Sequence, residues 1–327
     1  MASGAPLMVD QAGEHQRMLA DVRWGLAQPQ KQLSSKYFYD TRGSELFEEI
    51  TRTTEYYPTR TERELLAGEV VGWLEELGSL TLVELGAGSA RKTRILLTAM
   101  HADSSEACYV PVDVAGEFLH GTASDLRAEY PSLLVRPVVQ DITNPLDFAE
   151  DLRRPVLFAL IGSTIGNFDG DAAVDMLLNV SSAMTLDDRF LLGVDLRPSP
   201  QKSKERLEAA YNDSGGITAA FNRNILDVIN RGVGTDFDPS SFSHRASYVT
   251  EEGRIEMHLV SVREQEVLVP GGDPVHLDEG ETIRTEISCK YDRETVEQLF
   301  GAAGLSIDRW SQDSDGLYTL ALGRIER

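Results

Sequence analysis

The chain has 327 residues, and its 53 acidic residues outnumber its 31 Lys and Arg residues, giving a formal net charge of −22 at pH 7. This charge repels polyanions, and no basic cluster interleaved with aromatic residues offsets it, so composition argues against nucleic acid as a partner. Because the chain shows neither a charged leader with an apolar core nor an apolar run of membrane-spanning length, we expect a cytoplasmic protein that does not bind membranes. With 41% hydrophobic residues it can bury one large core or two modest ones.

Cysteine and histidine usage argues against disulfides and metals. Cys108 and Cys289 are the only cysteines and lie in apolar or strand-like sequence, which is typical of reduced thiols in a cytosolic protein. The 6 histidines show no paired metal-ligand spacing. The sequence therefore predicts no metal site.

Two helices are predicted before the first nucleotide-type motif. Apolar residues at helical spacing, such as Met18 and Val22, indicate an amphipathic helix over 14–28, and we expect residues 1–13 to be disordered. Thr61 and Glu64 form a capping-box pattern. This pattern predicts a second helix from Thr61 to about residue 77.

The stretch 80–92 is the most informative part of the sequence. An apolar run reaches Glu84 and is followed by Gly86 and Gly88, which indicates a buried strand, a tight turn and a helix over 91–100. A dinucleotide fingerprint would need a third glycine shortly after Gly88, and none follows. Glu84 instead suits a positively charged cofactor such as S-adenosylmethionine. The short motif is equally compatible with a strand-to-helix turn that binds nothing.

Further apolar strands are predicted over 107–113, 135–141, 156–164 and 190–195, and each ends on a polar or glycine residue. Separated by helical stretches, they indicate a parallel sheet whose carboxyl edge carries the chemistry. Asp113 follows Gly88 by about 25 residues, close to the separation of a ribose-binding carboxylate. Asp141 suits two roles equally well, capping a helix or binding on the adenine side.

The pattern changes over 196–288, which we interpret as an insertion with helices at 205–211 and 217–229 and alternating strand sequence at 256–269. The tail returns to α/β form, with a helix at 294–303 and strands at 305–310 and 317–322 around a turn. A closing hairpin of this kind is typical of methyltransferase folds rather than of dehydrogenases.

Ordered motifs run from about Lys36 to the C-terminus: Phe38-Tyr39-Asp40-x-x-Gly43-Ser44-x-Leu46-Phe47, Glu55-Tyr56-Tyr57-Pro58-Thr59-Arg60-Thr61-Glu62, Gly162-Ser163-Thr164-Ile165-Gly166-Asn167, Ala219-Ala220-Phe221-Asn222-Arg223-Asn224 and Arg254-Ile255-Glu256-Met257. With these motifs the chain resembles the histidine-specific Nα-methyltransferases of ergothioneine biosynthesis. Motifs of this length and order are far more specific than the glycine turn alone.

The resemblance implies transfer of three methyl groups from S-adenosylmethionine to the α-amino nitrogen of L-histidine, which gives hercynine in the first step of ergothioneine biosynthesis. It also implies an α/β fold with a Rossmann-like, seven-stranded class I methyltransferase domain, here expected at 60–195 plus 289–327. A second, substrate-binding α+β domain would combine the N-terminal segment and the long insertion, 14–59 plus 196–288. We expect a monomer.

The resemblance also implies roles for individual residues. Tyr39 would lie beside the reacting nitrogen, and Asn167 and Tyr211 would hold the carboxylate and amine end of the substrate. The cofactor contacts would be Gly86, Lys92, Asp113, Asp141 and Ile142. The imidazole pocket would be lined by Tyr56, Met257, Glu286 and Ser288. Ile142 stands where the family commonly has an aromatic residue, so the adenine environment is where this chain departs from the pattern.

These residue types suit the chemistry. Methyl transfer from a sulfonium is an in-line displacement, so the main task is to hold a neutral amine facing the methyl carbon, and we expect no dedicated general base. Glu286 and Ser288 are two apart on a predicted strand and share one face, which lets them contact both imidazole nitrogens. From the residues alone, spacing favours core packing for Met257, whereas for Glu286 a solvated strand face and a substrate contact are equally well supported.

Three other functions remain open from the sequence. The substrate can be another free amino acid or a partly methylated histidine. A nicotinamide-dependent oxidoreductase is disfavoured by the missing third glycine and by the closing hairpin. A non-catalytic regulator that binds the cofactor is the third alternative.

Overall fold

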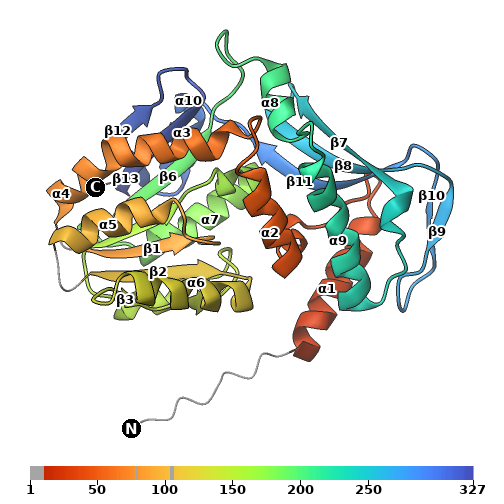
Figure 1. Ribbon diagram of the computed structural model, residues 1–327, viewed down its shortest axis with the longest axis horizontal. Helices are drawn as coiled ribbons and strands as arrows, with labels where there is room; N and C mark the ends of the chain where they lie inside the picture. Colours follow the sequence, from red (N-terminus) through yellow and green to blue (C-terminus); the bar gives the residue numbers. More distant parts are fainter. Residues whose placement is uncertain (1–10, 79, 104–106, 327) are drawn as a thin grey trace. The chain divides into compact units, whose positions relative to one another are not determined.

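The computed structural model describes residues 11–78, 80–103 and 107–326 (Figure 1). Of residues 1–13, which we expected to be disordered, 1–10 lie outside the described residues, whereas 11–13 belong to helix α1 (Gln11–Leu26), so that part of the expectation was wrong. The chain forms two compact units. The larger consists of Tyr39–Thr218, Ala246–Glu256 and the described residues from Ile287 onward, and the smaller of the described residues up to Phe38 with Ala219–Arg245 and Met257–Glu286.

A mixed, mainly parallel sheet forms the centre of the larger unit. Its strands are β1 (Thr81–Leu85), β2 (Cys108–Asp113), β3 (Leu134–Val135), β4 (Val138–Val139), β5 (Val156–Leu160), β6 (Arg189–Asp195), β12 (Leu305–Gln312) and β13 (Tyr318–Ile325). The strand order is β12-β13-β6-β5-β1-β2-β3, and β4 also pairs with β2. Strands β1, β2, β5 and β6 pair in parallel, whereas β13 is antiparallel to both β6 and β12. The predicted parallel sheet and its closing hairpin are confirmed.

Every residue of β1 and β5 is buried, as expected for parallel strands that are covered on both faces. The apolar core includes Phe158 on β5, Phe190 on β6 and Phe300, which lies on a helix near the C-terminus. The helices of this unit are α2 (Thr41–Ile50), α3 (Tyr57–Leu65), a π-helical turn (Leu66–Val70), α4 (Val71–Leu77), α5 (Thr93–Asp103), α6 (Gly116–Glu129), α7 (Gly170–Ala183), α8 (Lys204–Ala210) and α10 (Arg293–Ala302), with short 3₁₀ turns η3 (Asp147–Asp151) and η4 (Thr164–Asn167).

Several sequence-based boundaries were wrong, and three of them have a clear physical reason. Helix α3 begins at Tyr57, not at Thr61, because Pro58 in its first turn fixes a helical φ and needs no hydrogen-bond donor. The predicted strand 135–141 is split into β3 and β4 around Pro137, which cannot donate to a ladder. The strand predicted to reach residue 164 ends at Leu160, because the backbone turns at Gly162 with a φ of 84°.

The smaller unit combines the N-terminal segment with the long insertion. Its elements are α1 (Gln11–Leu26), η1 (Ser35–Phe38), most of α9 (Ile217–Val233), η5 (Pro239–Ser241), an antiparallel ladder of β9 (Gln265–Val267) and β10 (Val275–Leu277), and parts of β7 (Phe242–Val249), β8 (Arg254–Ser261) and β11 (Thr282–Cys289). The last three strands form a sheet in the order β11-β8-β7.

Backbone hydrogen bonds attach the N-terminal segment to the insertion. The N–H of Leu33 donates to the carbonyl of Arg284 at 2.9 Å, and the N–H of Arg284 donates to the carbonyl of Lys31 at 2.8 Å. Phe38 stacks on Phe221 with 4.5 Å between ring centroids. The boundaries of the compact units differ from those of the expected domains, because 39–59 and 196–218 belong to the larger unit. None of the described helices is long and apolar enough to cross a bilayer.

Candidate active site

The glycine turn after β1 is fastened to the end of β2. Gly86 and Gly88 adopt left-handed backbone conformations, with φ of 74° and 51°, which glycine tolerates without strain. The N–H of Gly86 donates to the carbonyl of Val112 at 2.8 Å, and the N–H of Gly88 donates to Oδ2 of Asp113 at 2.9 Å. The other oxygen of Asp113 accepts from the N–H of Ala115 at 2.9 Å. The structure thus brings Gly86 and Asp113 together at the carboxyl edge of the sheet.

Two exposed valines flank this carboxylate. Val139 on β4 is the ladder partner of Asp113 and is 51% exposed, and Val114, the next residue after Asp113, is 43% exposed. An apolar surface beside a carboxylate suits a nucleoside, whose base is apolar on its faces and whose ribose hydroxyls can donate to the carboxylate. Our sequence analysis treated Val139 as strand interior. Its place at a strand end, next to the predicted ribose ligand, was the signal that could have identified it.

Asp141 and Ile142 follow β4. Oδ1 of Asp141 accepts from the backbone N–H and the hydroxyl of Thr143, at 3.0 and 2.7 Å, which makes a local turn. No helix begins at this turn, so Asp141 does not have the helix-capping role considered for it. Ile142 is partly buried and packs against the apolar core. Contact of either residue with adenine stays a prediction.

The interpretation of Glu84 as an acid that faces a cationic cofactor is wrong. Its side chain is buried in the core, where it accepts hydrogen bonds from the hydroxyls of Thr93, at 2.6 Å, and of Tyr109. Burial raises the pKa of Glu84 to about 7, although both hydrogen bonds and the Lys92 charge act in the opposite direction. Glu84 therefore joins β1 to α5 and β2.

Lys92 forms an ion pair with Glu62, whose side chain is completely buried. Glu62 also accepts from the N–H of Gly162 at 2.7 Å and from the hydroxyl of Tyr318 at 2.6 Å. Its carboxylate thus links α3 to the turn after β5 and to β13. Glu62 and Tyr318 were missed as site-supporting residues, although Glu62 closes one of the motifs quoted above. The predicted cofactor contact of Lys92 stays a prediction.

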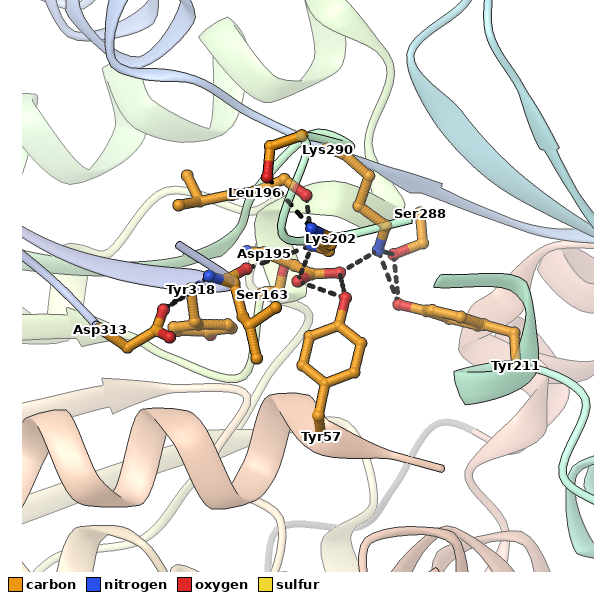
Figure 2. Close-up of polar contacts among 12 residues, drawn as sticks. Tyr57, Ser163, Asp195, Leu196, Lys202, Tyr211, Ser288, Lys290, Asp313 and Tyr318 are labelled. Carbon is orange, nitrogen blue, oxygen red and sulfur yellow. Dashed lines mark hydrogen bonds and ion pairs between the residues drawn. The ribbon is translucent and has the colours of Figure 1, made fainter. Parts of the chain in front are cut away.

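Tyr211 and Ser288 meet in a buried polar cluster (Figure 2). The Tyr211 hydroxyl lies 2.8 Å from Oγ of Ser288, and Nζ of Lys290 donates to both oxygens at 2.8 Å. Lys290 in turn lies 3.0 Å from Oδ2 of Asp195, at the carboxyl end of β6. Sequence reasoning noted Asp195 only as a strand-terminal acid and missed Lys290. The alternation of Glu286, Ser288 and Lys290 along one strand was the available signal.

The turn that carries Asn167 packs against Ser288. A Cβ at Gly166 would lie 2.9 Å from the carbonyl oxygen of Cys289 and 3.4 Å from Oγ of Ser288, so only glycine allows this approach. Ser163, in the same turn, has a φ of 58°, which is uncommon for a non-glycine residue. Its hydroxyl accepts from the N–H of Asp195 at 3.1 Å. The turn that carries Asn167 therefore lies next to Ser288, and the substrate contact of Asn167 stays a prediction.

A series of aromatic contacts links Tyr39 and Tyr56 to this cluster. Tyr39 packs edge-on against Phe47 with 5.9 Å between centroids, and Phe47 packs against Tyr56 at 6.2 Å. Tyr56 packs against Tyr211 at 6.1 Å. Edge-to-face packing of this kind fixes ring orientation. Phe47 was not predicted as a site residue, although it belongs to the same motif as Tyr39.

Met257 and Glu286 belong to the smaller unit, on the neighbouring strands β8 and β11. Met257 is buried and Glu286 partly buried. The hydroxyl of Thr285 donates to Oδ1 of Asn222 at 2.6 Å and to the carbonyl of Met257 at 3.2 Å, which fixes the two strands next to each other. Within the described part of the chain, no group of three or more His, Cys, Asp and Glu side chains is arranged to hold a metal ion.

Comparison with known proteins identifies the family of this chain. Residues 18–325 match the family described as histidine-specific methyltransferase, SAM-dependent. The chain is 41% identical to the histidine N-alpha-methyltransferase of Mycobacterium tuberculosis, over 94% of this chain and 95% of that protein. It is 40% identical to the same-named protein of Mycolicibacterium smegmatis, over 97% of each.

Solved structures support the fold. An S-adenosylmethionine-dependent methyltransferase from Clostridium acetobutylicum superposes with a TM-score of 0.51 at 13% identity, over 86% of this chain and 98% of that one. At this identity the likeness concerns the fold alone, a class I methyltransferase sheet, to which this chain adds small sheets of its own. The family match spans nearly the whole sequence. The chain therefore belongs to the family of S-adenosylmethionine-dependent, histidine-specific methyltransferases.

Proposed function

We propose that this protein transfers three methyl groups from S-adenosylmethionine to the α-amino nitrogen of L-histidine and so forms hercynine for ergothioneine biosynthesis. The observation that carries the proposal is the family match over residues 18–325, together with two relatives at 41% and 40% identity named histidine N-alpha-methyltransferase. A Neurospora crassa relative, 29% identical over 90% of this chain, is named ergothioneine biosynthesis protein 1. This membership argues against a nicotinamide-dependent oxidoreductase.

The carboxyl edge of the large sheet fits the cofactor. S-adenosylmethionine, when bound, supplies a methyl group on a positively charged sulfur. The left-handed turn at Gly86 and Gly88 leaves the backbone open to a ligand, since a Cβ at Gly88 would meet nothing within 4 Å. We assign Asp113 to the ribose hydroxyls. The exposed side chains of Val114 and Val139 support an adenine site there, and we keep Lys92, Asp141 and Ile142 as further cofactor contacts.

The polar cluster suits the amino-acid end of the substrate. We assign Asn167 and Tyr211 to the carboxylate and amine, and Tyr39 to the reacting nitrogen. All three are neutral hydrogen-bonding groups, so they can orient an amine without keeping it protonated. The buried surroundings and a nearby sulfonium both favour the neutral amine, which alone has a lone pair for attack. The proton is lost to water, and no side chain acts as a dedicated base.

We assign Tyr56, Met257, Glu286 and Ser288 to the imidazole ring. A neutral imidazole has one N–H donor and one nitrogen acceptor, so a carboxylate and a hydroxyl together satisfy both. Burying the ring without these partners would leave unmatched polar groups, and a site built in this way rejects analogues that lack them. This end of the site belongs to the second, substrate-binding domain that we propose from 14–59 and 196–288.

Two coarser features complete the proposal. Cys108 and Cys289 form no disulfide, which supports a reducing cytoplasmic location. We also propose that the protein is a monomer.

Mass spectrometry of the purified protein with S-adenosylmethionine and L-histidine tests the function. We expect products with one, two and three added methyl groups, and faster conversion of the mono- and dimethylated standards than of tryptophan. Ring methylation would give the same mass, so proton NMR must place the methyl groups on the α-nitrogen. Absence of product, or methyl groups on the ring, would contradict the proposal. Asp169→Ala, a change in a helix cap of α7, serves as an active control.

A further inference from the structure

The polar cluster that includes the Tyr211 hydroxyl contains two fully buried lysines and one fully buried carboxylate (Figure 2). Lys202 donates to Oδ1 of Asp195 at 2.6 Å and to the carbonyls of Leu196 and, at 3.1 Å, Leu317. Tyr57 donates to the same carboxylate at 2.8 Å. An ammonium group has three N–H donors, and three acceptors surround Lys202. Lys202 is therefore a structural cation that holds the loop after β6.

Lys290 differs from Lys202 in the acceptors of its other two N–H groups. One N–H faces Oδ2 of Asp195 at 3.0 Å, and the remaining two go to the side-chain oxygens of Tyr211 and Ser288. Lys290 is 1% exposed. It thus connects a buried carboxylate on one side to two hydroxyl groups that we have assigned to the substrate.

The direction of these hydrogen bonds has a chemical consequence. An ammonium group cannot accept a hydrogen bond, so both hydroxyl oxygens accept from Lys290 and neither hydroxyl proton can be directed to it. Tyr211 and Ser288 lie 2.8 Å apart, so one hydroxyl donates to the other. Lys290 thereby orients the Tyr211 hydroxyl and places a positive charge directly behind it.

The charges of the cluster indicate which kind of ligand group it favours. The three groups in direct contact, Asp195, Lys202 and Lys290, carry one negative and two positive charges. Asp313 acts on Lys202 from further away. Burial lowers the pKa of Lys202 to about 8, and the two lysines hold the pKa of Asp195 below its usual value although burial alone would raise it. A buried cation in excess is costly, and an anionic ligand relieves that cost.

We infer that Lys290 is a positioning residue for substrate recognition: through its hydrogen bond to Tyr211 it orients that hydroxyl and places a positive charge behind it, facing the ionised α-carboxylate of the amino-acid substrate. Lys290 does not itself contact the substrate. The inference rests on the proposed function, because it takes an α-amino acid as substrate. The new element is that the preference for a substrate with a free carboxylate depends on a charge located behind the Tyr211 hydroxyl.

Two amines distinguish recognition of the carboxylate from recognition of the ring. L-histidinol keeps the imidazole and the α-amine but has an alcohol where histidine has a carboxylate. For the wild type we expect a strong preference for L-histidine, measured as the ratio of kcat/KM for the two amines. Lys290→Met should reduce this ratio by roughly 10- to 100-fold, the range of one lost hydrogen bond to a charged group. The loss should appear mainly in KM for histidine, with unchanged affinity for S-adenosylmethionine.

Lys202→Met is the matched control. It removes the other fully buried lysine from the same carboxylate but touches neither Tyr211 nor Ser288. We expect a lower Tm and a much smaller loss of preference for histidine over histidinol than in Lys290→Met, because Lys202 contributes only to the net charge of the cluster. If both variants reduce the preference equally, Lys290 has only a structural role and the inference is wrong.

Lys290→Gln guards against a variant that fails to fold, because an amide can still donate to the two hydroxyls without carrying charge. It should show an intermediate loss of preference, and Tyr211→Phe should lose nearly as much as the double variant with Lys290→Gln, since Lys290 acts through Tyr211. A folded Lys290→Gln or Lys290→Met protein with the wild-type preference would overturn the inference. Failure of the wild type to methylate histidine would instead reject the proposed function.

Discussion

The backbone N–H of Gly88 donates a 2.9 Å hydrogen bond to Oδ2 of Asp113, so a single carboxylate closes the turn after β1 and terminates β2. The same carboxylate is the one we assign to the cofactor ribose. An aspartate that already accepts two backbone N–H groups is fixed in orientation before the ligand arrives. This pre-organisation reduces the entropy lost on binding.

Asp113→Ala should weaken binding of S-adenosylmethionine by about tenfold or more, because two ribose hydroxyls lose a charged acceptor. Isothermal titration calorimetry measures the change, and circular dichroism checks that the fold is intact. Asp169→Ala is the control, because Asp169 also accepts a backbone N–H, from Ala172 at 3.1 Å, but caps α7. Equal affinity of the Asp113→Ala and wild-type proteins would exclude the ribose assignment.

Glu286→Ala combined with Met257→Val should redirect the enzyme toward larger aromatic amino acids. Removing the carboxylate deletes a partner of the imidazole ring, and the smaller side chain at 257 adds space in a buried position. We expect kcat/KM for histidine to fall by at least about 100-fold and methylated tryptophan to become detectable.

The two single variants separate the contributions in that experiment. Glu286→Ala alone should account for most of the lost histidine activity, and Met257→Val alone should change it little. Unchanged kcat/KM for histidine in the double variant would remove Glu286 from substrate recognition.

Gly166→Ala should impair catalysis through a backbone clash. The added Cβ would lie 2.9 Å from the carbonyl oxygen of Cys289, so β11 or the turn that carries Asn167 must move. We expect a loss of roughly 1–3 kcal/mol in the free energy of unfolding, typical of overpacking, and a lower kcat/KM for histidine. Gly170→Ala is the control, because a Cβ there would meet nothing within 4 Å. If both alanine variants match the wild type in stability and in kcat/KM for histidine, the close approach at Gly166 is not needed for activity.

Glu84 predicts how stability depends on pH. Burial raises its pKa in the folded state to about 7 from the usual 4.5 of a glutamate, so the folded protein holds this proton more tightly than the unfolded chain. The stabilisation is complete below about pH 4.5 and is lost as pH rises through 7. Between pH 5 and 8 the wild type should lose about 2–3 kcal/mol relative to Glu84→Gln, which does not titrate. Urea unfolding of both proteins gives this difference, and parallel pH curves would refute it.

The sequence was sufficient for the large sheet because parallel strands buried on both faces appear as continuous apolar runs, and β1, β2, β5 and β6 all do. Helix starts were harder. Thr61 and Glu64 match a capping box, but Pro58 starts the helix earlier and places Thr61 inside it, buried. Local patterns compete, and tertiary packing decides between them.

The site was predictable where a motif or a strand end indicated it, as for Asp113. Lys290 and Glu62 were missed because a buried charge is recognised by its partner, and both partners are distant in sequence. The interpretation of Glu84 as a cofactor contact was wrong for the opposite reason. A polar residue after an apolar run predicts a ligand contact, but here Thr93 and Tyr109 satisfy its oxygens within the core.

The pairing of Gln32 with Arg284 determines when the smaller unit can assemble during protein synthesis. Leu33 finds its backbone acceptor only after Arg284 has left the ribosome, on the order of ten seconds to a minute later at typical rates of elongation. The segment around Leu33 therefore lacks this acceptor while the strands β1 to β6 emerge and pair. A chain released before Arg284 is made can complete those strand pairs but lacks the acceptor for its own beginning, which leaves that beginning open to chaperones and proteases.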